Sequence, residues 1–190
     1  ANMEASGYEF NRVKQGANSV YGITIEDVTK IYEYRGHEKL KDFQPNAITV
    51  FMCSLKGGVS KTVSGVTLAQ SLRTSPNLVP YDIKTLVIDL DPQSSATMFM
   101  NHNLTKGSLD TTSAQAMLQD LPKEEILSDY IYPSAIPGVD IMPASIEDAF
   151  LAANWEAICV EAEIAKDDIY QVLKKNIIDK IKDEYFEPII

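Results

Sequence analysis

The residues best suited to chemistry lie in a short glycine-rich stretch, KGGVSKT, which runs from Lys56 to Thr62. Backbone N–H groups can surround the anionic oxygens of a phosphate where no side chain stands in the way, and Gly57 and Gly58 meet that condition. Lys61 adds a cation that can reach the terminal phosphates, and the hydroxyl of Thr62 is a ligand that Mg²⁺ accepts. The stretch therefore predicts a loop that binds a nucleoside triphosphate.

A second motif supplies two carboxylates. Asp89 and Asp91 belong to the sequence DLDPQSSAT, which ends at Thr97. Two carboxylates beside a polyphosphate would repel it unless a metal ion or a water molecule to be activated lay between them. Their presence therefore favours Mg²⁺ and hydrolysis.

The surrounding chain indicates how both motifs are positioned. Residues 47–53 and 85–90 are short apolar runs, and we interpret both as buried strands. Beyond Thr62, apolar residues recur at helical spacing. The first unit is thus a strand, a tight loop and a helix. In an open α/β sheet, ligands bind at the carboxyl ends of the strands, which is where Asp89 and Asp91 fall.

The two motifs together resemble the ParA-type partition ATPases of the deviant Walker A class, relatives of MinD and of the nitrogenase iron protein. The general pattern G-x-x-x-x-G-K-[ST] is not met, because Leu55 and Ser60 stand at its glycine positions. The variant K-G-G-x-x-K-[ST] is met, although the family usually has glycine at Ser60 and threonine at Val63. The resemblance implies an α/β P-loop NTPase fold, with a mostly parallel sheet covered by helices on both faces, that binds ATP or ADP and Mg²⁺.

The resemblance also implies a role for each motif residue. Lys56 reaches the phosphates of the partner subunit in a nucleotide-sandwich homodimer, whereas Lys61 and Thr62 bind phosphate and Mg²⁺ within the subunit. Asp91 orients the attacking water, and Asp89 supports it. The residues expected at the nucleotide are Lys56, Gly57, Gly58, Val59, Ser60, Lys61, Thr62 and Val63, and those expected at the metal are Thr62, Asp89 and Asp91.

Composition limits the class of protein. With 190 residues, 45% of them hydrophobic, the chain can form one or two folded domains. Its two cysteines, Cys53 and Cys159, provide no framework for disulfides or metal, so we expect two reduced core residues and a cytoplasmic protein. No apolar run approaches the roughly 20 residues that cross a bilayer, so we expect a soluble protein. The N-terminal hairpin favours DNA over a membrane as its partner.

The charge is unevenly divided along the chain. The net charge is −10, and residues 1–46 carry 6 basic and 7 acidic side chains against 11 and 20 in the remainder. Nucleic-acid affinity depends on local basic patches more than on the total charge. Because no such patch follows Thr62, we expect any DNA-binding surface of the ATPase part to lie in sequence beyond this chain.

The first part of the chain predicts a hairpin and a helix. Residues 8–24 form two partly alternating runs around a polar turn, with Arg12 and Lys14 at the tip. Thr24 then caps a helix that ends at Gly36. From these residues alone, we favour a solvated hairpin that packs against the ATPase part. The family resemblance supports another interpretation, the wing of a winged helix-turn-helix whose basic residues contact DNA.

Later segments predict further elements. Residues 138–145 indicate a strand, 146–165 and 169–181 indicate helices, and 185–190 indicate another strand. Met98 to Met100 are either core residues or dimer contacts, and we favour the core. The acidic cluster that begins at Glu161 is interpreted as a solvated face, and His37 and His102 as histidines without a metal role.

These segments suggest two parts. Residues 1–46 would be the C-terminal part of a winged helix-turn-helix domain. Residues 47–190 would be the N-terminal portion of an ATPase domain, truncated before its Walker B residue. We therefore expect the chain to be a piece of a longer protein.

The resemblance implies a Mg²⁺-dependent ATPase that segregates plasmid or chromosomal DNA on the bacterial nucleoid. Its partners would be a ParB-type centromere-binding protein, nonspecific DNA, a second copy of the chain and operator DNA, through which it would repress its own operon. Two alternatives stay open: a MinD-like ATPase that acts on a membrane, and a repressor in which the nucleotide is chiefly an allosteric ligand.

Overall fold

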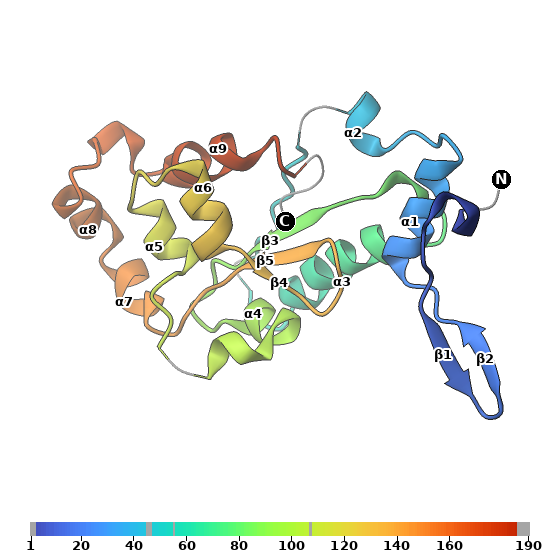
Figure 1. The fold of residues 1–190 in the computed structure, drawn as a ribbon. Coiled ribbons are helices and arrows are strands. Elements are labelled where there is room, and N and C mark those ends of the chain that lie inside the picture. Colours follow the sequence, from blue (N-terminus) through green and yellow to red (C-terminus); the bar gives the residue numbers. More distant parts are fainter. Residues whose placement is uncertain (1–2, 45–46, 55, 107, 186–190) are drawn as a thin grey trace.

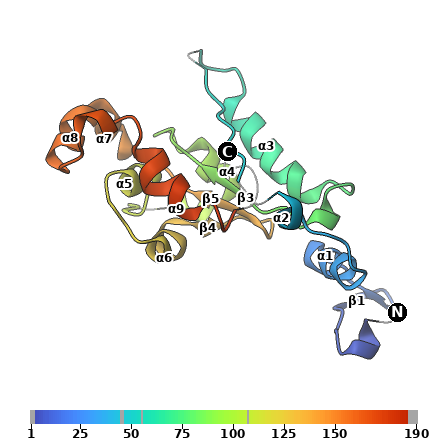
Figure 2. The same ribbon diagram turned by 90° about the horizontal axis from the view of Figure 1, so that it is seen from above.

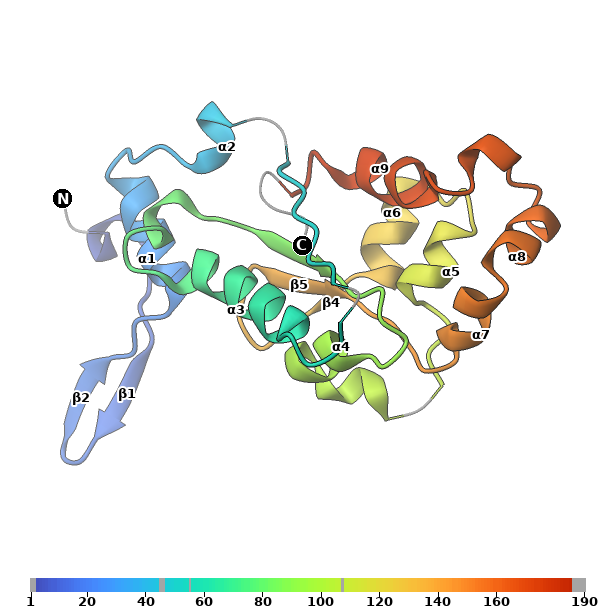
Figure 3. The same cartoon turned by 180° about the vertical axis from the view of Figure 1, so that it is seen from behind.

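The computed structural model places a small β-sheet between two layers of helices, with a hairpin-bearing unit at one side (Figure 1). Views from above and from behind show the same arrangement (Figures 2 and 3). The structure describes residues 3–44, 47–54, 56–106 and 108–185. Among these, no helix has both the length and the apolar character needed to cross a bilayer.

The sheet confirms the α/β class predicted from the sequence. β3 (Thr85–Ile88) and β5 (Val139–Met142) pair in parallel, with Thr85 opposite Val139 and Ile88 opposite Met142. β4 (Tyr132–Pro133) pairs with β5 in the antiparallel direction, so the described sheet is mixed, in the order β3-β5-β4. This strand was not predicted, because two residues are too few to show a periodic pattern.

The sheet separates two hydrophobic cores. The core beneath α3 (Lys61–Thr74) and α4 (Ser95–Met100) consists of Val66, Ala69, Val87, Ala96, Met100, Val139 and Ile141. The core on the opposite face consists of Leu86, Ala116, Leu121, Ile126, Tyr130, Met142, Ile177, Ile181 and Tyr185. Successive strand residues point to opposite faces, so the neighbours Leu86 and Val87 enter different cores. Burial on both faces explains why β3 shows a continuous apolar run and no alternation.

Several further helices between α3 and β4 are short. They are α5 (Ser113–Met117), α6 (Lys123–Glu125), the π-helical η4 (Ile126–Tyr130) and the 3₁₀ segments η2 (Val79–Tyr81) and η3 (His102–Thr105). The predicted helix 146–165 is instead two helices, α7 (Asp148–Ala153) and α8 (Trp155–Glu161), because the backbone leaves helical geometry at Asn154.

The predicted helix 169–181 is also less regular than expected. It follows the 3₁₀ turn η5 (Lys166–Asp168), contains the π-helical η6 (Leu173–Ile178) and ends in α9 (Asp179–Ile181). Its predicted apolar face still packs against the sheet, since Ile177 and Ile181 share a core with Leu86 and Met142, and Val172 is also buried. The spacing thus identified the buried face, although it did not reveal the wider π-helical turns.

The N-terminal unit confirms the predicted hairpin and helix. After η1 (Glu4–Ser6), β1 (Arg12–Gln15) and β2 (Asn18–Tyr21) form an antiparallel pair around a turn that contains Gly16. Thr24 caps α1 (Ile25–Tyr34) through a capping box with Asp27, and α2 (Leu40–Phe43) follows.

The hairpin projects away from the rest of the molecule (Figure 1). Every residue of its two strands is exposed, so the expectation that it packs against the ATPase part is wrong. Lys14 pairs with Ser19 beside the turn, whereas Arg12 pairs with Tyr21 at the opposite end of the ladder. The placement of Arg12 at the tip is therefore also wrong, because the strands extend closer to Gly16 than the sequence indicated.

The apolar run of residues 47–53 does not form the predicted buried strand. Thr49 makes an isolated bridge, and the side chain of Phe51 is 66% exposed. Cys53 is exposed, contrary to prediction, while Cys159 is buried as predicted. An apolar run becomes a strand where neighbouring strands accept its hydrogen bonds. In the described part of the sheet, β3 is hydrogen-bonded to β5 and forms no ladder with this run.

Two further predictions concern residues 98–100 and 185–190. Met100 is buried beside α3, as favoured, whereas Met98 and Phe99 are exposed, because the short helix α4 turns one face to the sheet. The predicted strand at 185–190 lies outside the described residues from position 186 onward.

Gly138, just before β5, supports a prediction about stability. Its φ is +83°, and a Cβ added there would lie 2.8 Å from Nε of the buried Arg73. Gly138→Ala should cost about 2–3 kcal/mol of unfolding free energy in urea titrations, since backbone strain adds to the displacement of a buried polar group. Gly36→Ala is the matched control, because Gly36 has φ +74° but its added Cβ meets no described atom within 4 Å. Equal losses in the two variants would contradict this account.

Candidate nucleotide site

The glycine-rich loop leads directly into α3, whose first two residues are Lys61 and Thr62. The unpaired N–H groups of a helix N-terminus attract anions, and here they face the loop. Gly58 has φ +72° and Ser60 has φ +59°, so two left-handed residues turn the chain into the helix. Glycine reaches this conformation without strain, which gives a physical reason for the family preference at Ser60.

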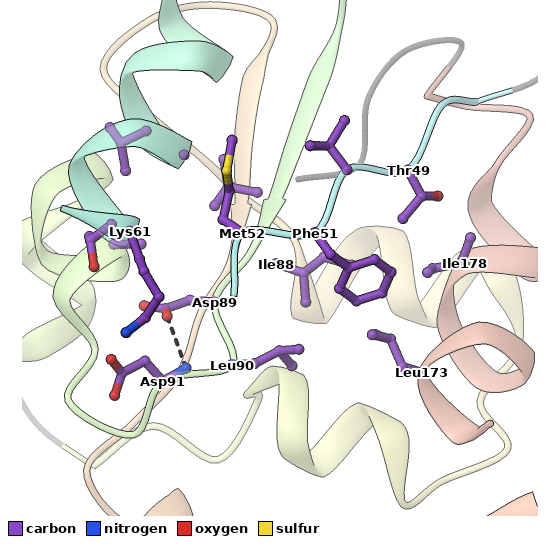
Figure 4. A pocket seen from close by; sticks show the side chains of 16 residues that line it. Thr49, Phe51, Met52, Lys61, Ile88, Asp89, Leu90, Asp91, Leu173 and Ile178 are labelled. Atoms are coloured by element: carbon purple, nitrogen blue, oxygen red, sulfur yellow. Dashed lines mark hydrogen bonds between the residues drawn. The ribbon is translucent and has the colours of Figure 1, made fainter. Parts of the chain in front are cut away.

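One pocket brings together four of the predicted site residues. Lys61, Thr62, Asp89 and Asp91 line it, and in Figure 4 the Lys61 side chain points toward the two aspartates. The rest of its lining is mostly apolar and includes Phe51, Met52, Leu90, Leu173 and Ile178. The other predicted loop residues, Lys56 to Ser60 and Val63, are exposed and do not line this pocket.

Asp89 is buried at the carboxyl end of β3, with a side chain that is 5% exposed. Its Oδ2 accepts hydrogen bonds from the backbone N–H of Thr97 at 2.9 Å and from the Thr97 hydroxyl at 2.8 Å, and its Oδ1 accepts one from the Asp91 N–H at 3.2 Å. Burial raises the pKa of Asp89, and these hydrogen bonds oppose that effect only in part. The carboxylate therefore fixes the chain around it more firmly than a solvated group would.

Asp91 differs from Asp89 in its surroundings. It is exposed, and its Oδ1 accepts a hydrogen bond from the Gln93 N–H at 2.9 Å. This local bond orients the carboxylate at the edge of the pocket, opposite Lys61 (Figure 4). The hydroxyl of Thr62 and two carboxylates are oxygen donors of the kind that Mg²⁺ prefers. Within the described residues, no group of three Cys, His, Asp or Glu side chains forms a separate metal site.

Two site residues had no role in the sequence prediction. The Thr97 hydroxyl, which donates to Asp89, also accepts the N–H of Ala144 at 3.0 Å. Ser113 donates from its hydroxyl to the Asp89 carbonyl at 2.5 Å and from its N–H to the Pro143 carbonyl at 2.7 Å. The ends of β3 and β5 are thus tied together. Thr97 closes the DLDPQSSAT motif, but no sequence signal singled out Ser113.

A buried carboxylate extends this polar layer. Asp148 accepts hydrogen bonds from the Thr112 hydroxyl at 2.9 Å and from the Ser145 N–H at 2.8 Å. The segment after β5 is therefore attached both to α7 and to the start of α5.

The two predicted DNA-binding residues lie in β1 of the hairpin. The hairpin projects away from β3 and β5 (Figure 1). Arg12 donates from Nη2 to the Tyr21 hydroxyl at 2.7 Å, and its guanidinium lies 4.4 Å from the centre of the Tyr21 ring. The Tyr21 hydroxyl in turn donates to Glu4 at 2.9 Å. Arg12 therefore braces the base of the hairpin, whereas Lys14 is exposed beside the turn.

The fold and the site define the class of protein: an α/β P-loop protein whose phosphate loop enters a helix beside the carboxyl ends of parallel strands. Comparison with known families makes the assignment specific. Residues 1–44 match the model of the ParA helix turn helix domain, and residues 47–190 match an AAA domain model. The chain therefore belongs to the ParA family of partition proteins.

Curated relatives agree with this assignment. The chain is 49% identical over 183 residues to plasmid partition protein A of Escherichia coli, a match that covers 96% of this chain and 46% of the relative. It is 30% identical over 90 residues to the chromosome partitioning protein ParA of Myxococcus xanthus, which covers 47% of this chain and 28% of that protein.

Solved structures show the same fold. A structure described as a partition protein superposes with a TM-score of 0.81 at 37% identity, over 99% of this chain and 48% of that one. A Cyanothece McdA variant in complex with ATP has a TM-score of 0.54 at 19% identity, over 76% of this chain and 47% of that one. Cobyrinic acid a,c-diamide synthase from Mycobacterium smegmatis, with bound ADP and magnesium, has a TM-score of 0.53 at 20% identity, over 76% of this chain and 50% of that one. The chain spans about half the length of these proteins.

The backbone at Ser60 supports a second prediction. A serine held at φ +59° is strained, so Ser60→Gly should raise the unfolding free energy by about 1 kcal/mol. Ser64→Gly is the matched control, because Ser64 lies in α3, where glycine should lower stability by about 0.5–1 kcal/mol. Thermal and urea unfolding would measure both changes, and a destabilised Ser60→Gly variant would contradict the strain.

Proposed function

We propose that the chain forms the phosphate-binding part of a Mg²⁺-dependent ATPase that partitions plasmid or chromosomal DNA in bacteria. The observation that carries this proposal is the meeting of Lys61, Thr62 and Asp91 in one pocket at the N-terminus of α3. A cation, a hydroxyl and carboxylates at this point suit a metal-bound triphosphate. The description of the Escherichia coli relative, and the nucleotides in the titles of two solved neighbours, support it.

Phosphate binding would rest on the start of α3. The backbone of residues 57–61 and the helix dipole favour negative charge at this end of the helix. Lys61 adds a full charge and would stabilise the phosphoryl group as it is transferred. Thr62, with the carboxylates of Asp89 and Asp91 behind it, would hold Mg²⁺, which when bound neutralises phosphate charge.

Hydrolysis of the β–γ bond requires an oriented water molecule. Asp91 is exposed at the edge of the pocket and is held by the Gln93 N–H, so it can accept a hydrogen bond from that water. Asp89 would act through Asp91, because it already accepts the Asp91 N–H. Water would add to the γ-phosphorus, and the bond to the bridging oxygen would break, leaving ADP and phosphate.

Lys56 would complete the site from a second copy. It is exposed on the loop and does not line its own pocket, so it can extend toward the nucleotide of a partner subunit. ATP would then drive homodimerisation, because a second cation near the phosphates lowers the cost of bringing two acidic chains together.

DNA binding would use the N-terminal unit. Lys14, beside the turn of an exposed hairpin, can contact a phosphate without displacing any packed element. This unit would bind operator DNA and repress the protein's own operon. Nonspecific DNA on the nucleoid and a ParB-type centromere-binding protein would be the other partners, all in the cytoplasm. The match of residues 1–44 to a helix-turn-helix model favours DNA over a membrane as the surface on which the protein acts.

The first experiment measures ATP turnover by the intact protein, with and without DNA and its partner protein. We expect Asp91→Ala to lower turnover by about 10²-fold or more, because the water loses its orienting group. Asp167→Ala removes an exposed carboxylate far along the chain and should leave turnover unchanged. Unimpaired hydrolysis by the Asp91→Ala variant would refute the assigned role.

The proposed role of Lys56 has a separate test. In sedimentation velocity with ATP and Mg²⁺, Lys56→Ala should remain largely monomeric, while its affinity for ADP stays close to that of the unaltered protein. Lys166→Ala removes an exposed lysine outside the loop and should dimerise normally. A Lys56→Ala variant that dimerises and hydrolyses ATP normally would show that this lysine does not act across the dimer.

A further inference from the structure

A network of ion pairs crosses the junction between the N-terminal unit and the domain that holds the nucleotide pocket. It begins at Arg73, in the last turn of α3, whose side chain is 4% exposed. Arg73 donates from Nε to the Pro137 carbonyl at 2.8 Å and from Nη1 to the Ile83 carbonyl at 3.3 Å. Its guanidinium is thus held by the backbone on two sides.

Asp82 receives the remaining contact of this arginine. Its Oδ1 lies 2.8 Å from Nη1 of Arg73, and its Oδ2 lies 3.2 Å from Nζ of Lys39 in the N-terminal unit. Burial by itself would raise the pKa of Asp82, but the hydrogen bonds from Arg73 and Lys39 outweigh it and hold that pKa below its usual value. One carboxylate therefore joins a buried cation of the P-loop helix to a cation of the other unit.

Lys39 extends this network of ion pairs to α1. Its Nζ lies 3.2 Å from Oε1 of Glu33, and Glu33 also contacts Lys30 at 3.6 Å. The Lys39 and Asp82 side chains are 19% and 21% exposed, whereas the Glu33 side chain is 47% exposed. Because solvent screens exposed ion pairs, the Lys39–Asp82 contact is the stronger of the two links.

Aromatic rings cross the same junction. His37 lies edge-on to Tyr32 of α1, with ring centres 5.4 Å apart, and to Tyr81 of η2, at 5.3 Å. Phe43 of α2 contacts Tyr81 at 6.0 Å. His37 is exposed, but its ring lies between a ring of each unit. The rings and the ion pairs converge on neighbouring residues, Tyr81 and Asp82.

α3 connects the nucleotide pocket to this junction. The helix has 14 residues and spans about 21 Å, with Lys61 at one end and Arg73 at the other. A shift of the helix when phosphate binds at its N-terminus would move Arg73, and with it Asp82, at the junction. The hairpin belongs to the N-terminal unit, which Lys39 links to Asp82.

We propose that Arg73, Asp82 and Lys39 are positioning residues that couple the nucleotide pocket to the DNA-binding hairpin. This inference rests on the proposed function, since it needs a bound nucleotide and a bound DNA. The coupling is reciprocal: if nucleotide changes the affinity for DNA by some factor, DNA changes the affinity for nucleotide by the same factor. Couplings of this kind are typically about 5- to 150-fold.

The test compares Lys39→Met with Lys41→Met in the intact protein. Both variants remove one positive charge from the region of α2, but Lys41 forms no ion pair with a described carboxylate. Fluorescence anisotropy with a labelled mixed-sequence DNA duplex would give the affinity with and without ADP and Mg²⁺. We expect the nucleotide effect to be at least about 5-fold in the unaltered protein and in Lys41→Met, and to fall below about 2-fold in Lys39→Met.

A second variant and a second measurement separate the possible failures. Asp82→Asn keeps a residue that tolerates the φ of +55° at this position and should reduce the nucleotide effect in the same way. Titration with a fluorescent ADP should give affinities in the absence of DNA that agree within about 2-fold across all variants. A nucleotide effect on DNA affinity that is equal in Lys39→Met and Lys41→Met, or absent while both ligands bind, would overturn the coupling alone. Failure of the unaltered protein to bind nucleotide would overturn the proposed function as well.

Discussion

The parallel pairing of β3 with β5 is the constraint on which the site depends. It brings the carboxyl ends of two strands that are far apart in sequence to one edge of the sheet. Asp89 donates its N–H to the Met142 carbonyl at 3.0 Å, and Ser113 bonds to the backbone beyond both strands. Because α3 packs on one face of this pair, Lys61 at its start meets Asp89 across the pocket. Loss of the pairing would separate the cation from the carboxylates.

The two aspartates differ in burial. Asp89 is buried away from solvent and accepts hydrogen bonds from the N–H groups of Thr97 and Asp91. Because these bonds offset part of the cost of burial, Asp89 stabilises the loop after β3 in this conformation. Because burial raises the pKa of Asp89, its charged carboxylate costs folding free energy, and this cost grows as pH rises through the folded pKa. Asp91 keeps its solvent and so avoids that cost. The buried acid orders the loop after β3, and the exposed one faces solvent at the edge of the pocket.

Much of the fold was predictable because its signals are local. The capping box at Thr24, the helix after Lys61 and the apolar run of β3 each depend on neighbours within a few residues. The site residues Thr97 and Ser113 were missed because their partners are tertiary. The run at 47–53 failed for the same reason: hydrophobicity predicts burial, but a strand forms where another strand offers hydrogen bonds, and that cannot be known from the run itself.

The distribution of ion pairs explains how so acidic a chain can still favour anionic ligands. In its C-terminal third, lysines are matched to nearby acids, as in the pairs Lys123–Asp183, Lys175–Asp168 and Lys180–Asp120. Such exposed pairs contribute little to stability, but they leave few free cations on that surface.

Lys14, Lys56 and Lys61, in contrast, form no ion pair with a described carboxylate. A local excess of unpaired cations attracts phosphate more effectively than the net charge repels it, because screening limits repulsion to about 8–10 Å. The unpaired lysines of the hairpin and the loop can therefore attract anions despite the net charge of −10.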